Sequence, residues 1–152
     1  MKVFLFLLFT FFLDITFNLY ININLLYPMF TLSSLIILYF LIKNKNNYLI
    51  LSIILGFIYD LIYSNIFINT ILFLIISLII KNIFNKNISI IKILFTFLII
   101  IFIYDLSLFL YVVIVNKYSY SLNIFLNKYL SSLIINFIYI IIFCRKKYYK
   151  KY

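Results

Sequence analysis

The chain has very few of the residues on which catalysis and metal binding usually depend. Its 152 residues include no histidine, no tryptophan, one cysteine, one glycine, one proline and three acidic residues. Without histidine, a cysteine cluster or a glycine-rich loop, it offers no zinc-ligand pattern, no phosphate-binding loop and no nucleophile with a base beside it. Three carboxylates could in principle bind a metal, but their spacing specifies none. We therefore expect a protein that is not an enzyme and that holds no cofactor.

Charged residues are also scarce, and apolar residues dominate. The chain is 68% hydrophobic and 11% charged, with a mean hydropathy of +1.24, whereas soluble domains are about half apolar and about a quarter charged. This composition predicts an all-α integral membrane protein in which residues 1–152 form a single transmembrane domain. We expect the segment after Lys2 to be retained, because Asp14 interrupts it and no small-residue cleavage site follows. The lone Cys144 cannot form a disulfide within the chain.

Six apolar segments can be distinguished, which predicts a bundle of six transmembrane helices. Pro28 stands near the start of the second, and Ser64 and Asn65 favour a turn that divides the long apolar stretch 48–80 in two. A basic tail, 145–152, ends the chain. The predicted spans are approximately 3–21, 26–42, 48–63, 66–80, 90–115 and 129–143.

The basic residues set the predicted orientation of these spans. Six spans place 11 of the 13 Lys and Arg residues on one side and only Lys117 and Lys128 on the other, which predicts that the first side is cytoplasmic, with both termini inside. Joining the third and fourth spans would destroy this asymmetry. We attribute the net charge of +10 to topology and to contact with anionic lipid rather than to nucleic acid. The residues predicted to contact lipid from the tail are Arg145, Lys146, Lys147, Lys150 and Lys151.

The three acidic residues all lie inside apolar segments. They are Asp14 in FFLDITF, Asp60 in GFIYDLIY and Asp105 in FIYDLSLF, separated by 46 and 45 residues. The sequence Ile58–Leu61 recurs as Ile103–Leu106, so one aspartate falls in each odd-numbered span. A carboxylate at the centre of a membrane helix costs roughly 2.5–3.5 kcal/mol. We expect the function of the chain to depend on these residues, which share a depth of about 20 Å in a core of about 30 Å.

The residues that lie at a spacing of four from each aspartate rank the three aspartates as functional candidates. Polar or small side chains follow one helix face at Thr10, Asp14, Asn18 and Asn22, and at Ser52, Gly56, Asp60 and Ser64, whereas Ile101 and Phe109 flank Asp105. Such faces normally point into a helix bundle. Possible partners on the even-numbered spans are Asn69, Ser77, Ser132 and Asn136. Two interpretations stay open: protonated side chains that hold helices together, or an acidic layer that binds a cation, a substrate or a partner's basic residue. Asp60 is the first functional candidate.

The sequence from Tyr27 to Phe67 resembles the MreD family of bacterial rod-shape membrane proteins. The resemblance lies in Pro28 before the second span and in the motif Gly56-Phe57-Ile58-Tyr59-Asp60, followed by a turn and another apolar segment. It implies a non-enzymatic scaffold in the bacterial cytoplasmic membrane that acts in peptidoglycan elongation and the regulation of cell shape. The partners it implies are MreC-like and MreB-like proteins and the RodA/penicillin-binding-protein synthase.

The same resemblance implies a fold similar to the substrate-binding S components of energy-coupling-factor vitamin transporters. This gives an alternative function, in which the aspartates line a vitamin pocket. The absence of tryptophan argues against such a pocket, which usually mixes polar groups with aromatic ones. A proton- or cation-conducting subunit is a third possibility, because aspartates within membrane helices often serve such pathways.

Overall fold

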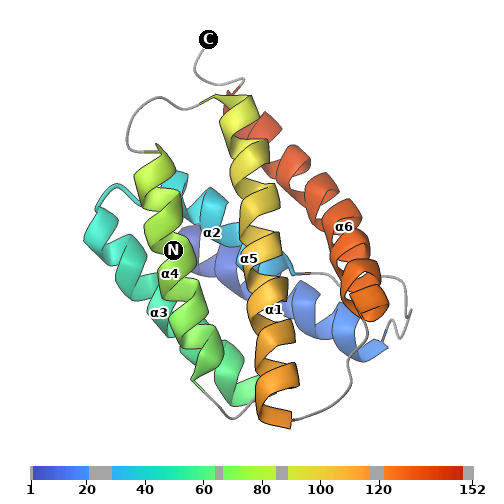
Figure 1. The fold of residues 1–152 in the computed structure, drawn as a ribbon. Coiled ribbons are helices and arrows are strands. Elements are labelled where there is room, and N and C mark those ends of the chain that lie inside the picture. Colours follow the sequence, from blue (N-terminus) through green and yellow to red (C-terminus); the bar gives the residue numbers. More distant parts are fainter. Residues whose placement is uncertain (1, 21–28, 64–66, 85–88, 117–121, 149–152) are drawn as a thin grey trace.

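The computed structural model describes residues 2–20, 29–63, 67–84, 89–116 and 122–148, which form six helices and no strand (Figure 1). The predicted all-α class is confirmed, and so is the division of residues 48–80 into two helices. The helices are α1 (Lys2–Tyr20), α2 (Phe30–Leu41), α3 (Lys45–Tyr63), α4 (Ile68–Phe84), α5 (Ile90–Asn116) and α6 (Leu122–Tyr148).

Helices α2 and α6 differ most in length from the predicted spans. Helix α2 begins at Phe30 rather than at residue 26, and its 12 residues rise only about 18 Å; Pro28 lies outside the described residues. Helix α6 begins at Leu122 rather than at residue 129, because Phe125 is buried and stacks on Tyr129. It also continues to Tyr148, into the predicted basic tail, since Lys and Arg favour helices.

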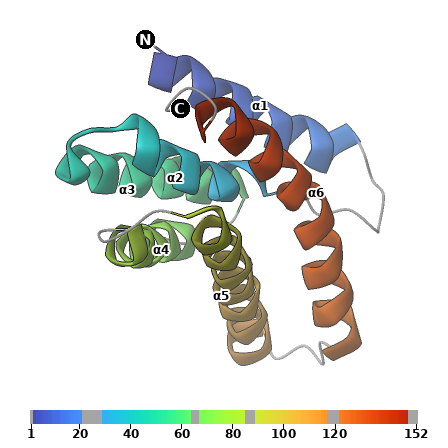
Figure 2. The ribbon, with the colours of Figure 1, turned by 90° about the horizontal axis from the view of Figure 1, so that it is seen from above.

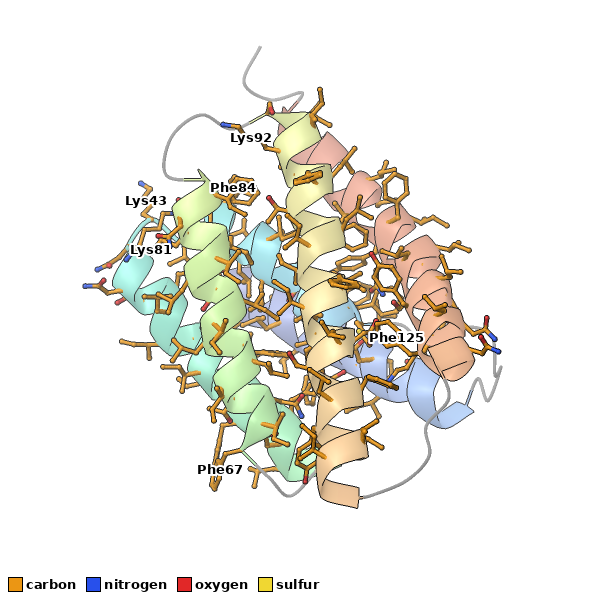
Figure 3. All side chains as sticks on the ribbon, in the orientation of Figure 1. Lys43, Phe67, Lys81, Phe84, Lys92 and Phe125 are labelled. Carbon is orange, nitrogen blue, oxygen red and sulfur yellow. The ribbon has the colours of Figure 1, made fainter. Side chains whose placement is uncertain are left out.

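Three of the helices in the described part of the chain are long and apolar enough to cross a membrane. Their apolar stretches are Lys45–Ile62 in α3, Ile90–Ile114 in α5 and Phe125–Ile142 in α6. The apolar stretches of α1, α2 and α4 are shorter. Large hydrophobic side chains cover the outside of the bundle, as lipid contact requires (Figure 3). The protein is therefore a helical membrane protein.

Helix α2 is the centre of the bundle. It contacts all five other helices, and every residue from Phe30 to Tyr39 is buried. Figure 2 shows α1 and the C-terminal part of α6 on one side of α2, and α4 and α5 on the other. Consecutive helices run antiparallel, and the most extensive contacts are within the pairs α3–α4, α1–α2 and α5–α6.

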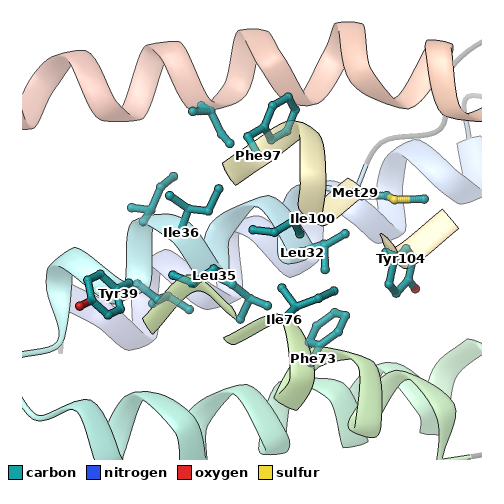
Figure 4. Packing of buried hydrophobic residues seen from close by; sticks show 14 of the residues in the cluster. Met29, Leu32, Leu35, Ile36, Tyr39, Phe73, Ile76, Phe97, Ile100 and Tyr104 are labelled. Carbon is teal, nitrogen blue, oxygen red and sulfur yellow. The ribbon is translucent and has the colours of Figure 1, made fainter. Parts of the chain in front are cut away.

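The apolar core surrounds α2 along its length. Leu32, Leu35 and Ile36 of α2 meet side chains from α4 and α5, with Met29 and Tyr104 at one end of the core and Tyr39 at the other (Figure 4). The side chains that α4 and α5 contribute there are Phe73, Ile76, Phe97 and Ile100. This core fixes where both ends of α2 lie, and polar side chains of other helices bind those ends.

Candidate functional site

Asp14 binds the beginning of α2. Its Oδ1 accepts a hydrogen bond from the backbone N–H of Phe30 at 2.7 Å, and its Oδ2 accepts one from that of Thr31 at 2.8 Å. The first N–H groups of a helix have no acceptor within the helix, and a carboxylate there also interacts favourably with the helix dipole. Asp14 is 0% exposed, so this buried acid satisfies donors that would otherwise be stranded in an apolar core.

A second side chain, from the far end of the sequence, completes the same cap. The N-cap residue of α2, Met29, makes no side-chain cap itself, and its N–H donates to Oδ1 of Asn136 in α6 at 3.0 Å. The hydroxyl of Ser33 donates to the same oxygen at 3.2 Å. The Asn136 amide group donates in turn to the carbonyl of Ser132 at 2.7 Å. Helices α1 and α6 thus both bind the start of α2.

A basic side chain binds the other end of α2. Nζ of Lys45 donates to the carbonyl oxygens of Tyr39 at 2.6 Å and Ile42 at 3.2 Å, and it lies 3.6 Å from the centre of the Tyr39 ring. The last carbonyls of a helix carry partial negative charge, which a cation stabilises. Helix α2 therefore has an acid at its positive end and an ammonium group at its negative end.

Asp60 repeats the geometry of Asp14 in the next pair of helices. Its Oδ1 accepts the N–H of Asn69 at 2.9 Å. Its Oδ2 accepts both the N–H of Thr70 at 2.8 Å and the Thr70 hydroxyl at 2.6 Å. These donors belong to the first turn of α4. Asp60 of α3 is therefore the cap of α4, as Asp14 of α1 is the cap of α2.

Gly56 makes this approach possible. A Cβ at Gly56 would lie 2.6 Å from Cα of Thr70 and 2.7 Å from the carbonyl oxygen of Asn69, where no side-chain atom fits. One turn earlier, the hydroxyls of Ser52 and Ser77 lie 2.8 Å apart. The predicted small-residue face of α3 thus lies against α4, and Ser52, Gly56 and Asp60 follow one another along the contact. Small residues at such a contact are typical of membrane helix pairs.

Asp105 has the same place in the third pair but a different partner. It is 2% exposed, its Oδ2 lies 3.3 Å from Oγ of Ser132, and its Oδ1 has no hydrogen-bond partner among the described residues. Helix α6 starts at Leu122, so at Ser132 the carboxyl meets the middle of a helix, where no first-turn N–H is available. The aspartate that the sequence ranked last is the one that capping does not explain.

Two tyrosines, which sequence reasoning did not single out, connect the successive pairs. The Tyr59 hydroxyl donates to Asp14 Oδ2 at 3.4 Å, and the Tyr104 hydroxyl donates to Oδ1 of Asn69 at 2.7 Å. In each copy of the Ile-Tyr-Asp-Leu repeat, the tyrosine thus binds the preceding pair: Tyr59 binds the capping Asp14, and Tyr104 binds Asn69, whose N–H Asp60 caps. The repeat was therefore the signal that could have identified them.

The remaining predicted site residues are placed as follows. Thr10 is buried and donates to a carbonyl of its own helix, that of Leu7, at 2.9 Å. No group of three or more His, Cys, Asp or Glu residues that could hold a metal occurs in the part of the chain that the structure describes. Positions that lie outside the described residues are Asn22, Ser64, Lys117, Lys150 and Lys151.

Comparison with known proteins assigns the chain to no family. No protein-family model matches the chain, and no curated protein or solved structure is significantly similar to it.

Proposed function

We propose that this protein is a non-enzymatic membrane scaffold subunit of the bacterial machinery that elongates the cell wall and determines rod shape, similar to MreD. The observation that carries the proposal is the Gly56–Asp60 motif, on which the resemblance to that family depends. In the structure this motif joins two helices, with Gly56 against the backbone of α4 and both Asp60 oxygens bound to its first turn. A motif that fixes helix geometry suits a scaffold better than a reactive site.

The use of the buried polar groups also supports a scaffold. Asp14, Asn136 and Lys45 bind the ends of α2, and Asp60 binds the start of α4. Each such bond fixes one helix relative to another, so the bundle presents a defined outer surface to partner helices. Partners expected from the resemblance are MreC-like and MreB-like proteins and the RodA/penicillin-binding-protein synthase.

The proposed topology has six crossings of the bacterial cytoplasmic membrane, with both termini in the cytoplasm. Lys43, Lys81 and Lys92 gather at one end of the bundle, and Phe67 lies at the other (Figure 3). This clustering supports the cytoplasmic assignment of that end, where the lysines would meet anionic lipid headgroups. Helices α1, α2 and α4 would cross with shorter apolar stretches than α3, α5 and α6.

Depletion of the protein in a rod-shaped bacterium that encodes it tests this function. We expect the cells to become round, because insertion of new wall along the cylinder would fail. Wild-type protein supplied in trans should restore the rods, and so should Ile54→Ala, which changes an exposed side chain of α3. Gly56→Leu should not restore them, because it forces α3 and α4 apart. Rods of normal shape after depletion would refute the proposal, and a vitamin that copurifies with the protein would favour the S-component alternative instead.

A further inference from the structure

The hydrogen bonds around Asp105 indicate where a proton lies. The Ser132 hydroxyl has one hydrogen and two neighbouring oxygen atoms, the Tyr129 carbonyl at 2.9 Å and Asp105 Oδ2 at 3.3 Å. Both oxygens can accept the hydroxyl hydrogen, and the Tyr129 contact is the shorter, so we assign the hydrogen to that carbonyl. A hydrogen on the Asp105 carboxyl would then complete the contact between Ser132 and Asp105.

The other two aspartates show what an ionised carboxylate requires in this bundle. Asp14 and Asp60 each accept two backbone N–H groups at the positive end of a helix, which stabilises negative charge. Asp105 has no such donors, and its Oδ1 has no hydrogen-bond partner in the described chain. A buried carboxyl without donors takes up a proton instead of remaining an anion.

The charged and titratable groups that face Asp105 come from α6. Lys128 and Tyr129 both interact electrostatically with it, and Lys128 lies one helical turn before Ser132 on the same face of α6. The titratable groups of the other two helices packed against α5 are Tyr39 in α2 and Lys81 in α4. Both lie toward the opposite end of the bundle (Figures 3 and 4).

The position of Lys128 gives the ionised form an alternative partner. The neutral acid donates to Ser132, whereas an anion at Asp105 would find an ammonium group one turn away along the same helix. A lysine side chain can reach that far, because its flexible four-carbon stem lets the ammonium group move between neighbouring turns.

We propose that Asp105 and Ser132 form a proton-binding site between α5 and α6, in which Asp105 carries the proton as a neutral acid and Lys128 receives the anion after proton release. The ligand is a single proton. Release moves the carboxyl from Ser132 toward Lys128 and so changes the contact between the two longest helices of the bundle. The site does not depend on the scaffold function.

Infrared spectroscopy of the purified full chain in lipid nanodiscs tests this site. The C=O stretch of a protonated carboxyl is resolved from the carboxylate bands. At neutral pH we expect one such band in the wild-type protein, its loss in Asp105→Asn and its retention in Asp60→Asn. In Lys128→Met the band should persist to a higher pH than in the wild type, because the anion has lost its counter-charge.

Two results would overturn the proposal. One is the absence of the protonated band from the wild-type protein at neutral pH, and the other is its survival in Asp105→Asn. Far-UV circular dichroism shows whether each variant has folded. If Asp105→Asn does not fold, Ser132→Ala decides: removal of the proton acceptor should shift the frequency of the band, and an unchanged frequency refutes the site.

Discussion

Replacing Gly56 with alanine measures how much the stability of the bundle depends on the close approach of α3 and α4. The new Cβ would lie 2.6 Å from Thr70 Cα and 2.7 Å from the Asn69 carbonyl oxygen, whereas ordinary contacts are 3.4–4 Å. Both neighbours are backbone atoms, which no side-chain rotation can move. The two helices must therefore separate by about 1 Å, or the chain must accept an overpacked contact.

The cost follows from two terms that oppose folding and one that favours it. Overpacking typically costs about 1–3 kcal/mol. A separation of about 1 Å also stretches the hydrogen bonds from Asn69 and Thr70 to Asp60 beyond useful length, and loss of a helix cap costs about 1 kcal/mol. The higher helix propensity of alanine offsets about 1 kcal/mol. We expect Gly56→Ala to lower the free energy of unfolding by roughly 1–3 kcal/mol.

Reversible unfolding of the purified protein in mixed micelles, followed by far-UV circular dichroism, measures this change. The matched control is Ile54→Ala, which places alanine on the same helix at a side chain that is 47% exposed; its effect should stay below about 1 kcal/mol. If Gly56→Ala is as stable as the wild type while the control behaves as expected, the tight contact we describe between α3 and α4 does not limit stability.

Three further substitutions test the caps and the links between helix pairs with the same unfolding measurement. Asp60→Ala strands the donors at the start of α4 and should destabilise by about 2 kcal/mol, more than Asp60→Asn, which keeps one acceptor oxygen; equal effects would contradict the capping role. Tyr104→Phe removes the donor to Asn69 and should cost about 1 kcal/mol, and no change would mean that this bond adds nothing. Lys45→Met should lower the free energy of unfolding by about 1 kcal/mol, because the last carbonyls of α2 lose their cationic partner. Lys43→Met is the neutral control.

The sequence was sufficient to predict the helical membrane class, the division of residues 48–80 and the small-residue face of α3. All three depend on local patterns: hydropathy, turn residues and spacing of four. The burial of Ser52, Gly56 and Asp60 followed from the same reasoning, because polar residues in apolar helices face inward. Such patterns are visible without knowledge of which helices meet.

The ranking of the aspartates could not be obtained in this way. Asp14 and Asp60 serve as caps because the first turns of α2 and α4 come to lie against them, which is a tertiary fact. The start of α6 likewise depends on the burial of Phe125 among other aromatic rings. Because α6 starts early, Asp105 meets it well after its first turn and has a different environment from Asp14 and Asp60. The polar residues Asn123 and Lys128 obscured that early start in the local sequence.

The cap that Asn136 makes on Met29 constrains the order in which the protein can be assembled. The two residues are 107 positions apart, so during synthesis α2 is made long before its acceptor exists. Until α6 enters the bundle, the Met29 N–H must find a temporary partner, in water or in the insertion machinery, because a stranded donor in lipid is costly. The start of α2 therefore has its full set of acceptors only after α6 has entered the bundle.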